Sequence, residues 1–90
     1  MLDLASMPVY LVEPSATQAR AITGMLDRHG VRNVLAFGSG GAMLERAGAA
    51  PPALVVTALY LPDMNGGELI AALRRAQGDD RTPFILISSE

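Results

Sequence analysis

Short apolar runs alternate along the chain with segments in which apolar residues recur at helical spacing. The apolar runs predict four β-strands, at Pro8–Glu13, Asn33–Phe37, Ala53–Ala58 and Pro83–Ser88. Within each run the apolar residues are nearly continuous and do not alternate with polar ones. This pattern is typical of strands that are covered on both faces. We therefore expect a buried sheet between layers of helices.

Three helices are predicted between the strands, each opened by a residue that is favourable at a helix N-cap. The predicted capping residues are Ser15 with Gln18, Ser39, and Asn65 with Glu68. The first helix is expected over about 15–29 with Gly30 as its stop signal, and Gly78-Asp79-Asp80 closes the third. The second helix is the weakest prediction, because Gly40 and Gly41 in its first turn each cost up to about 1 kcal/mol relative to Ala.

The predicted order of elements is β-α-β-α-β-α-β. Strands joined by helices imply right-handed crossovers, and hence an α/β fold with a parallel, doubly wound sheet. Ligands of such sheets bind beyond the carboxyl ends of the strands. Glu13, Pro14, Ala58 and Ser88 lie at the ends of the first, third and fourth strands, so they are the residues to consider for a site.

Composition restricts the classes of function. Ninety residues allow one domain, expected over residues 8–90 after a flexible start at 1–7. A net charge of −2, with seven arginines and no lysine, argues against nucleic-acid binding through this domain. The absence of cysteine and the single histidine exclude a disulfide framework and a His/Cys metal site. No apolar run approaches the roughly 18 residues of a membrane span and no signal peptide is evident, so a cytoplasmic location is expected.

Three segments together resemble the receiver domain of bacterial response regulators, the CheY-like family. They are Leu11–Arg20, Leu54–Gly66 with its loop Pro62-Asp63-Met64-Asn65-Gly66, and Thr82–Glu90. The resemblance implies a flavodoxin-like sheet of strand order 2-1-3-4, here without the family's fifth strand and last helix. It also implies a role in two-component, phosphorelay signal transduction.

The resemblance breaks down at the residues that carry the family's chemistry. Counting back from Pro62, Ala58 stands where the family has its phosphate-accepting aspartate, and a methyl group cannot attack phosphorus. The family's acidic pair at the end of the first strand corresponds to Glu13-Pro14, of which only Glu13 is acidic. The resemblance implies a lysine as the third functional residue of the site, but the sequence contains no lysine. Ser88 matches the Ser or Thr that the family has at this position. We therefore predict a degenerate pocket with no catalytic residue, no metal, no cofactor and no enzymatic turnover.

The fourth predicted strand is an exposed apolar edge, made of Phe84, Ile85, Leu86 and Ile87. Such an edge is a template for strand pairing. We expect the chain to be a fragment of a longer protein. The alternative is a naturally short protein whose edge is covered by a second protomer or a partner strand.

The function predicted from these features is a phosphorylation-independent pseudo-receiver that acts as an interaction or dimerisation module. Its partner is expected to be a sensor kinase, an output domain or a second copy of the chain, with Tyr60 as a candidate contact. One alternative is a small-molecule or nucleotide sensor that uses the vacated pocket. Another is a phosphotransfer receiver with Glu13 or Asp63 as the acceptor.

Overall fold

The computed structural model describes residues 3–78 and 81–88. Its elements are β1 (Val9–Val12), α1 (Ala16–Arg28), β2 (Val34–Phe37), α2 (Gly40–Ala49), β3 (Leu54–Ala58), α3 (Gly66–Gln77) and β4 (Phe84–Ile87). The four strands form one parallel sheet of order β2-β1-β3-β4, which confirms the predicted fold class and strand order. None of the helices in these ranges is long and apolar enough to cross a membrane.

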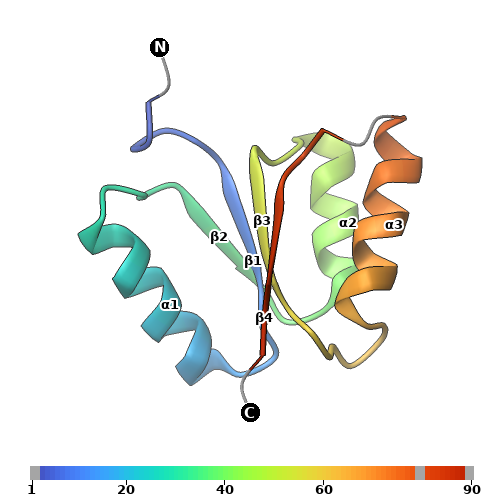
Figure 1. The fold of residues 1–90 in the computed structure, drawn as a ribbon, viewed down its shortest axis with the longest axis horizontal. Coiled ribbons are helices and arrows are strands. Elements are labelled where there is room, and N and C mark those ends of the chain that lie inside the picture. Colours follow the sequence, from blue (N-terminus) through green and yellow to red (C-terminus); the bar gives the residue numbers. More distant parts are fainter. Residues whose placement is uncertain (1–2, 79–80, 89–90) are drawn as a thin grey trace.

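Helices cover both faces of the sheet. Figure 1 shows α1 on one face, with α2 and α3 side by side on the other. The core is accordingly split into two clusters of buried side chains. The cluster under α2 and α3 contains Tyr10, Val12, Met43, Ala47, Val55, Leu69 and Leu73. The cluster under α1 contains Val9, Leu11, Ala19 and Val56.

The central strand β1 is buried along its whole length, as its continuous apolar run predicts. Its side chains alternate between the two clusters, so both faces of the strand contribute to the core. The Tyr10 hydroxyl donates a hydrogen bond to the Ala50 carbonyl oxygen, and its ring packs edge-on against Phe37 at 5.1 Å between centroids. The buried hydroxyl group of Tyr10 therefore has its hydrogen-bond acceptor in the segment that follows α2.

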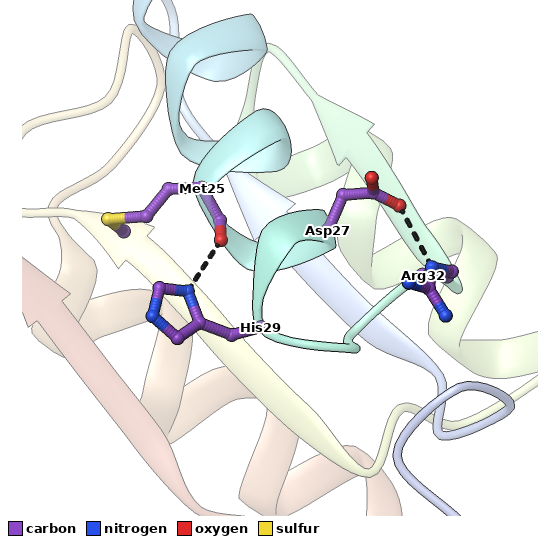
Figure 2. A network of polar contacts seen from close by, with 4 residues as sticks. All are labelled: Met25, Asp27, His29 and Arg32. Carbon is purple, nitrogen blue, oxygen red and sulfur yellow. Dashed lines mark hydrogen bonds and ion pairs between the residues drawn. The ribbon is translucent and has the colours of Figure 1, made fainter.

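Polar contacts close the C-terminal end of α1. Gly30, with φ of 90°, donates its N–H to the Asp27 carbonyl, which confirms the predicted stop signal. The His29 ring donates from Nδ1 to the Met25 carbonyl oxygen at 2.9 Å (Figure 2). Asp27 and Arg32 form an exposed ion pair at 3.3 Å. These contacts turn the chain back toward β2.

The third helix has both of its predicted termini. Asn65 and Glu68 form a reciprocal capping box, with bonds of 2.8 and 2.9 Å. Gly78 ends the helix in the left-handed conformation and donates its N–H to the Arg74 carbonyl. Asp79 and Asp80, which were also predicted to close this helix, lie outside the described residues.

Every strand is slightly shorter than predicted. The residues that flank the strands form main-chain hydrogen bonds, but they do not take part in the regular strand pairing. The Ala53 N–H still donates to the Pro8 carbonyl, and the Asn33 carbonyl accepts from Val9. Of the predicted start at 1–7, residues 3–7 form a turn in which the Asp3 carbonyl accepts from the Ser6 and Met7 N–H groups.

Candidate functional site

The carboxyl ends of three strands meet around a small cavity of about 140 Å³. The parallel register brings Val12 beside Thr57, and Ala58 beside Ile87, so the segments that follow these strands emerge together. The residues that line the cavity are Glu13, Pro14, Ala58, Leu59, Tyr60, Ile87 and Ser88. All four residues expected at the strand ends are therefore brought together, and Tyr60 joins them.

Ala58 forms an apolar part of the cavity wall. Its residue is 9% exposed, and its side chain offers a methyl group without a lone pair. The preceding residue, Thr57, is fully buried and donates its hydroxyl to the Ala58 carbonyl oxygen at 3.0 Å. Because that hydroxyl is committed to the main chain, it offers no substitute nucleophile to the cavity.

Among the residues that the structure describes, Glu13 is the one carboxylate in the cavity lining, and part of its binding capacity is already used. Its Oε2 atom accepts the Ser15 N–H at 2.9 Å, while Ser15 Oγ accepts the Gln18 N–H at 3.2 Å. The predicted capping box at α1 is therefore only half correct. The Ser15 N–H that Gln18 was expected to bind is bound by Glu13, because the short turn after β1 brings that carboxylate closer.

A divalent cation, which the resemblance to receiver domains implies beside the acidic pair, does not fit these residues. Mg²⁺ requires near-octahedral oxygen ligands, of which one or two are carboxylates. Here Pro14 and Ala58 offer no side-chain oxygen, and Glu13 is engaged with the backbone of Ser15. Among the residues that the structure describes, no group of three or more His, Cys, Asp or Glu side chains is arranged to hold a metal ion.

The loop between β3 and α3 forms the outer wall of the cavity. Tyr60 is 71% exposed and Leu59 is 36% exposed, so both present apolar surface to solvent. The loop is closed by main-chain bonds from Leu61 to the Met64 carbonyl and from Gly66 to the Leu59 carbonyl. The prediction of Tyr60 as an accessible contact residue is therefore compatible with its position, and Leu59 beside it was missed.

Asp63 ties this loop to the start of α2. Its two carboxylate oxygens accept the N–H groups of Gly40 and Gly41 at 3.0 and 2.8 Å. The Gly41 bond, followed by the Gly40 bond, lowers the pKa of Asp63 below its ordinary value of 3.8. From sequence, Asp63 was named as an alternative phosphoryl acceptor, and its contact with α2 was not predicted. The sequence feature that could have indicated this contact was the pair of glycines at the start of α2.

That glycine pair is explained by close packing. A Cβ atom on Gly40 would lie 2.5 Å from Met64 Sδ, and one on Gly41 would lie 3.1 Å from Asp63 Oδ2. The side chains of the β3–α3 loop thus occupy the space that larger residues would need. Ser39 still caps α2 through its hydroxyl, as predicted.

A larger cavity of about 350 Å³ lies between α2 and α3, near the amino ends of the strands. Its described lining residues are Leu44, Ala47, Gly48, Pro51, Leu73, Ala76 and Gln77, none of which is ionisable. We assign the candidate site to the smaller cavity, because that one combines a carboxylate with two hydroxyl groups at the strand ends.

Comparison with known proteins identifies the class of domain. The family model described as "Response regulator receiver domain" matches residues 9–90. Chemotaxis protein CheY1 of Helicobacter pylori is 31% identical over 85 residues, which cover 93% of this chain and 68% of that protein. A two-component response regulator of rice, ORR7, is 30% identical over 83 residues. The chain spans only 39% of the length of the rice protein.

Solved structures agree with these matches. A sensor protein from Polaromonas sp. JS666 is 30% identical with a TM-score of 0.78, over 93% of this chain and 66% of that one. The chemotaxis response regulator CheY4 of Vibrio cholerae superposes with a TM-score of 0.83 over 93% of this chain and 69% of that one. At 23% identity, the second comparison supports the fold alone.

Proposed function

The chain belongs to the response regulator receiver domain family, and from this membership we propose that it is a pseudo-receiver that works without phosphorylation. The observation that carries the proposal is the methyl group of Ala58 in the wall of the cavity at the strand ends. Aspartyl-phosphate formation requires a carboxylate nucleophile, and no change of pKa or loop position turns alanine into one.

Two further features of the same site support the proposal. Pro14 removes the second carboxylate expected at the end of β1, and the 90 residues contain no lysine to neutralise a phosphoryl group. Ser88 remains on the cavity wall, but a hydroxyl alone supplies neither a nucleophile for phosphorus nor a cation. No turnover is expected from this set of side chains.

With phosphorylation removed, we propose that the domain acts by binding another protein. The surfaces available for this are the exposed Tyr60 beside the cavity and the edge strand β4, whose Ile85 and Leu86 are each 49% exposed. Edge strands offer unpaired main-chain groups together with apolar side chains, which is the basis of β-strand addition. The partner in this role is a sensor kinase, an output domain or a second copy of the chain.

The size of the cavity favours this role over a nucleotide sensor. Pockets for small organic ligands usually enclose roughly 300–1,000 Å³. The cavity at the strand ends measures about 140 Å³, so a nucleotide would also have to occupy the neighbouring open hollows of about 240 and 310 Å³ that share Glu13 with it. A metabolite screen by thermal shift tests this alternative directly, and a saturable shift with a nucleotide would restore it.

The proposal is tested with a phosphoryl mimic. The chain is titrated with beryllium fluoride and Mg²⁺, and separately with an acyl-phosphate donor, while backbone amide NMR shifts and the melting temperature are recorded. We expect no saturable change at Ala58, Leu59 or Ser88, because the site lacks the ligands for both metal and phosphoryl group. Site-localised, saturable shifts would overturn the proposal.

A further inference from the structure

In the part of the chain that the structure describes, strand β2 has a neighbouring strand, β1, on one side only. The carbonyl groups of Asn33 and Phe37 accept hydrogen bonds from N–H groups in and just after β1, so they point toward that strand. Main-chain groups of alternate residues point the same way in a strand, so those of Leu35 also face β1. The N–H and C=O groups of Val34 and Ala36 therefore point away from the sheet.

A fifth strand would leave this edge unchanged. In the flavodoxin-like order 2-1-3-4-5, the fifth strand extends the sheet beside β4, and β2 stays at the opposite end. The four described strands follow that order. The Asn33 side chain donates to the Ser6 carbonyl oxygen at 2.9 Å, which places the described start of the chain at the amino end of β2. The outward groups of Val34 and Ala36 lie beyond that point along the strand.

An open hollow of about 310 Å³ lies beside this edge. Ala16, Ala19, Arg20 and Ala36 are among its lining residues, and none of the described lining residues comes from β4. Val34 packs against the cluster under α1, and side chains alternate along a strand, so the Ala36 side chain lies on that same face. Paired residues of neighbouring strands carry their side chains on one face. A residue of an added strand opposite Ala36 would therefore direct its side chain over the hollow.

We propose that the β2 edge binds an extended, acidic segment of a different protein, one of whose aliphatic side chains enters this hollow. This inference rests on the proposed interaction role and names a surface and the chemistry of its partner. The outward main-chain groups of Val34 and Ala36 bond the segment, as in other cases of β-strand addition. The small side chains of Ala16 and Ala19 leave space for the aliphatic group, which supplies selectivity that main-chain bonds lack.

Charge favours an acidic partner over a second copy. Residues 15–37, which span α1, the following loop and β2, contain Arg20, Arg28 and Arg32 but only one acid, Asp27. With histidine neutral, three positive charges and one negative charge give this segment +2, although the whole chain carries −2. Asp27 is already paired with Arg32 (Figure 2). Two copies joined through β2 would bring like charges together, whereas the carboxylates of an acidic segment are attracted.

Fluorescein-labelled peptides of about nine residues, a typical strand length, test the proposal with the 90-residue chain. The probe has leucine at its centre and alternates valine with glutamate on both sides, so that the leucine and the glutamates share one face. The control peptide has lysine in place of each glutamate. By fluorescence anisotropy, we expect the acidic peptide to bind at least about tenfold more tightly than the control. Equal affinities, or no binding of the acidic peptide at about 1 mM, would overturn the proposal.

Variants of the chain separate the main-chain contact from the charge. Ala36→Pro removes an outward N–H group, a change that edge strands tolerate, and should weaken binding of the acidic peptide by at least about tenfold. Arg20→Glu should weaken it by about tenfold, whereas Arg75→Glu, the same change of charge on α3, should leave the affinity unchanged. Circular dichroism identifies the folded variants. Unchanged affinity in a folded Ala36→Pro or Arg20→Glu variant would overturn the proposal.

Amide hydrogen exchange locates the bound peptide. In the free chain the amides of Leu35 and Phe37 should exchange slowly because they face β1, and those of Val34 and Ala36 should exchange quickly. Saturation with the acidic peptide should slow exchange at Val34 and Ala36 by at least about tenfold. Protection of these two amides that rises with protein concentration without peptide would indicate pairing between copies and would overturn the choice of partner. The beryllium fluoride titration does not involve β2, so failure here leaves the pseudo-receiver proposal standing.

Discussion

At the scale of single residues, the cavity at the strand ends differs from a phosphorylation site in several independent ways. Restoring one of the missing side chains should therefore not restore phosphorylation. We expect Ala58→Asp in the 90-residue chain to remain unphosphorylated by an acyl-phosphate donor over hours, because Pro14 still withholds a metal ligand and these 90 residues contain no lysine to balance the phosphoryl charge. Intact-protein mass spectrometry detects the added phosphoryl group.

The matched comparison adds the second carboxylate. The double variant Ala58→Asp, Pro14→Asp should bind Mg²⁺ more tightly than the single variant, because three neighbouring carboxylates then face the cavity. Rapid phosphorylation of the single variant would contradict the role assigned to Pro14.

The carboxylate of Asp63 should make the stability of the folded chain depend on pH in the acidic range. Its pKa is held below 3.8 in the folded chain by the N–H groups of Gly41 and Gly40, so the folded state favours the ionised form. The resulting stabilisation is present above the ordinary pKa and is lost as the pH falls through the lowered one. We expect Asp63→Asn to melt lower than the parent at pH 7, with a gap that is constant down to about pH 5 and closes below about pH 4.

The control for this prediction is Asp27→Asn, which removes an exposed ion pair and should change the melting temperature little. A gap that closes between pH 7 and pH 5 would assign the effect to a different group. The contact of Asp63 with α2 was missed from sequence because it joins residues 22 and 23 positions apart. Local patterns such as capping boxes carry no information on such distant pairs.

At the scale of elements, close packing explains which glycines are required. A Cβ atom on Gly66 would lie 2.6 Å from Leu86 Cδ2 and 3.0 Å from the Ala58 carbonyl oxygen. Gly66→Ala should therefore force α3 away from the sheet and destabilise the chain by about 1–3 kcal/mol. Gly48→Ala in α2 is the matched control, because nothing lies within 4 Å of its added methyl group. It should gain up to about 1 kcal/mol from helix propensity.

Urea unfolding of both variants measures these changes. A neutral Gly66→Ala would mean that Leu86 moves aside at no cost, and that α3 is not held tightly against β4. An unfavourable Gly48→Ala would contradict the open surroundings of that residue. Only the relative order of the two variants is needed, since both substitutions change the unfolded state in the same way.

The elements themselves were predictable because their signals are local. A continuous apolar run is enough to predict β1, and Ser39 and Asn65 mark the starts of α2 and α3 by chemistry that acts within one helical turn. The rule that parallel strands present ligand sites at their carboxyl ends was enough to bring Glu13 and Ala58 together. Leu59 was missed because its contribution to the cavity depends on the path of a loop, which periodicity does not describe.

At the scale of the whole molecule, the two faces of the sheet are unequally covered. In the part of the chain that the structure describes, two helices cover one face and a single helix covers the other, and β4 lies at the edge of both clusters (Figure 1). A domain of this size buries little more than about 60% of its unfolded surface, so any surface covered by association contributes a large share of its stability. The apolar side chains of β4 are therefore expected to contribute to the free energy of unfolding as well as to the proposed partner binding.

If the proposed partner is a second copy of the chain, this coupling predicts a melting temperature that rises with protein concentration. When two copies unfold and separate together, a tenfold increase in concentration adds about 1.4 kcal/mol per dimer, or about 0.7 kcal/mol per chain. For a domain of this size that corresponds to roughly 3–5 °C. Calorimetry between about 10 µM and 1 mM measures the shift, and Ile85→Lys should reduce it by placing a charge among the exposed apolar side chains of β4. Leu35→Lys on the opposite edge should keep it, because β2 lies two strands away from β3 and three from β4 in the sheet order. A melting temperature that does not change with concentration would mean that the exposed Ile85 and Leu86 serve a partner other than a second copy.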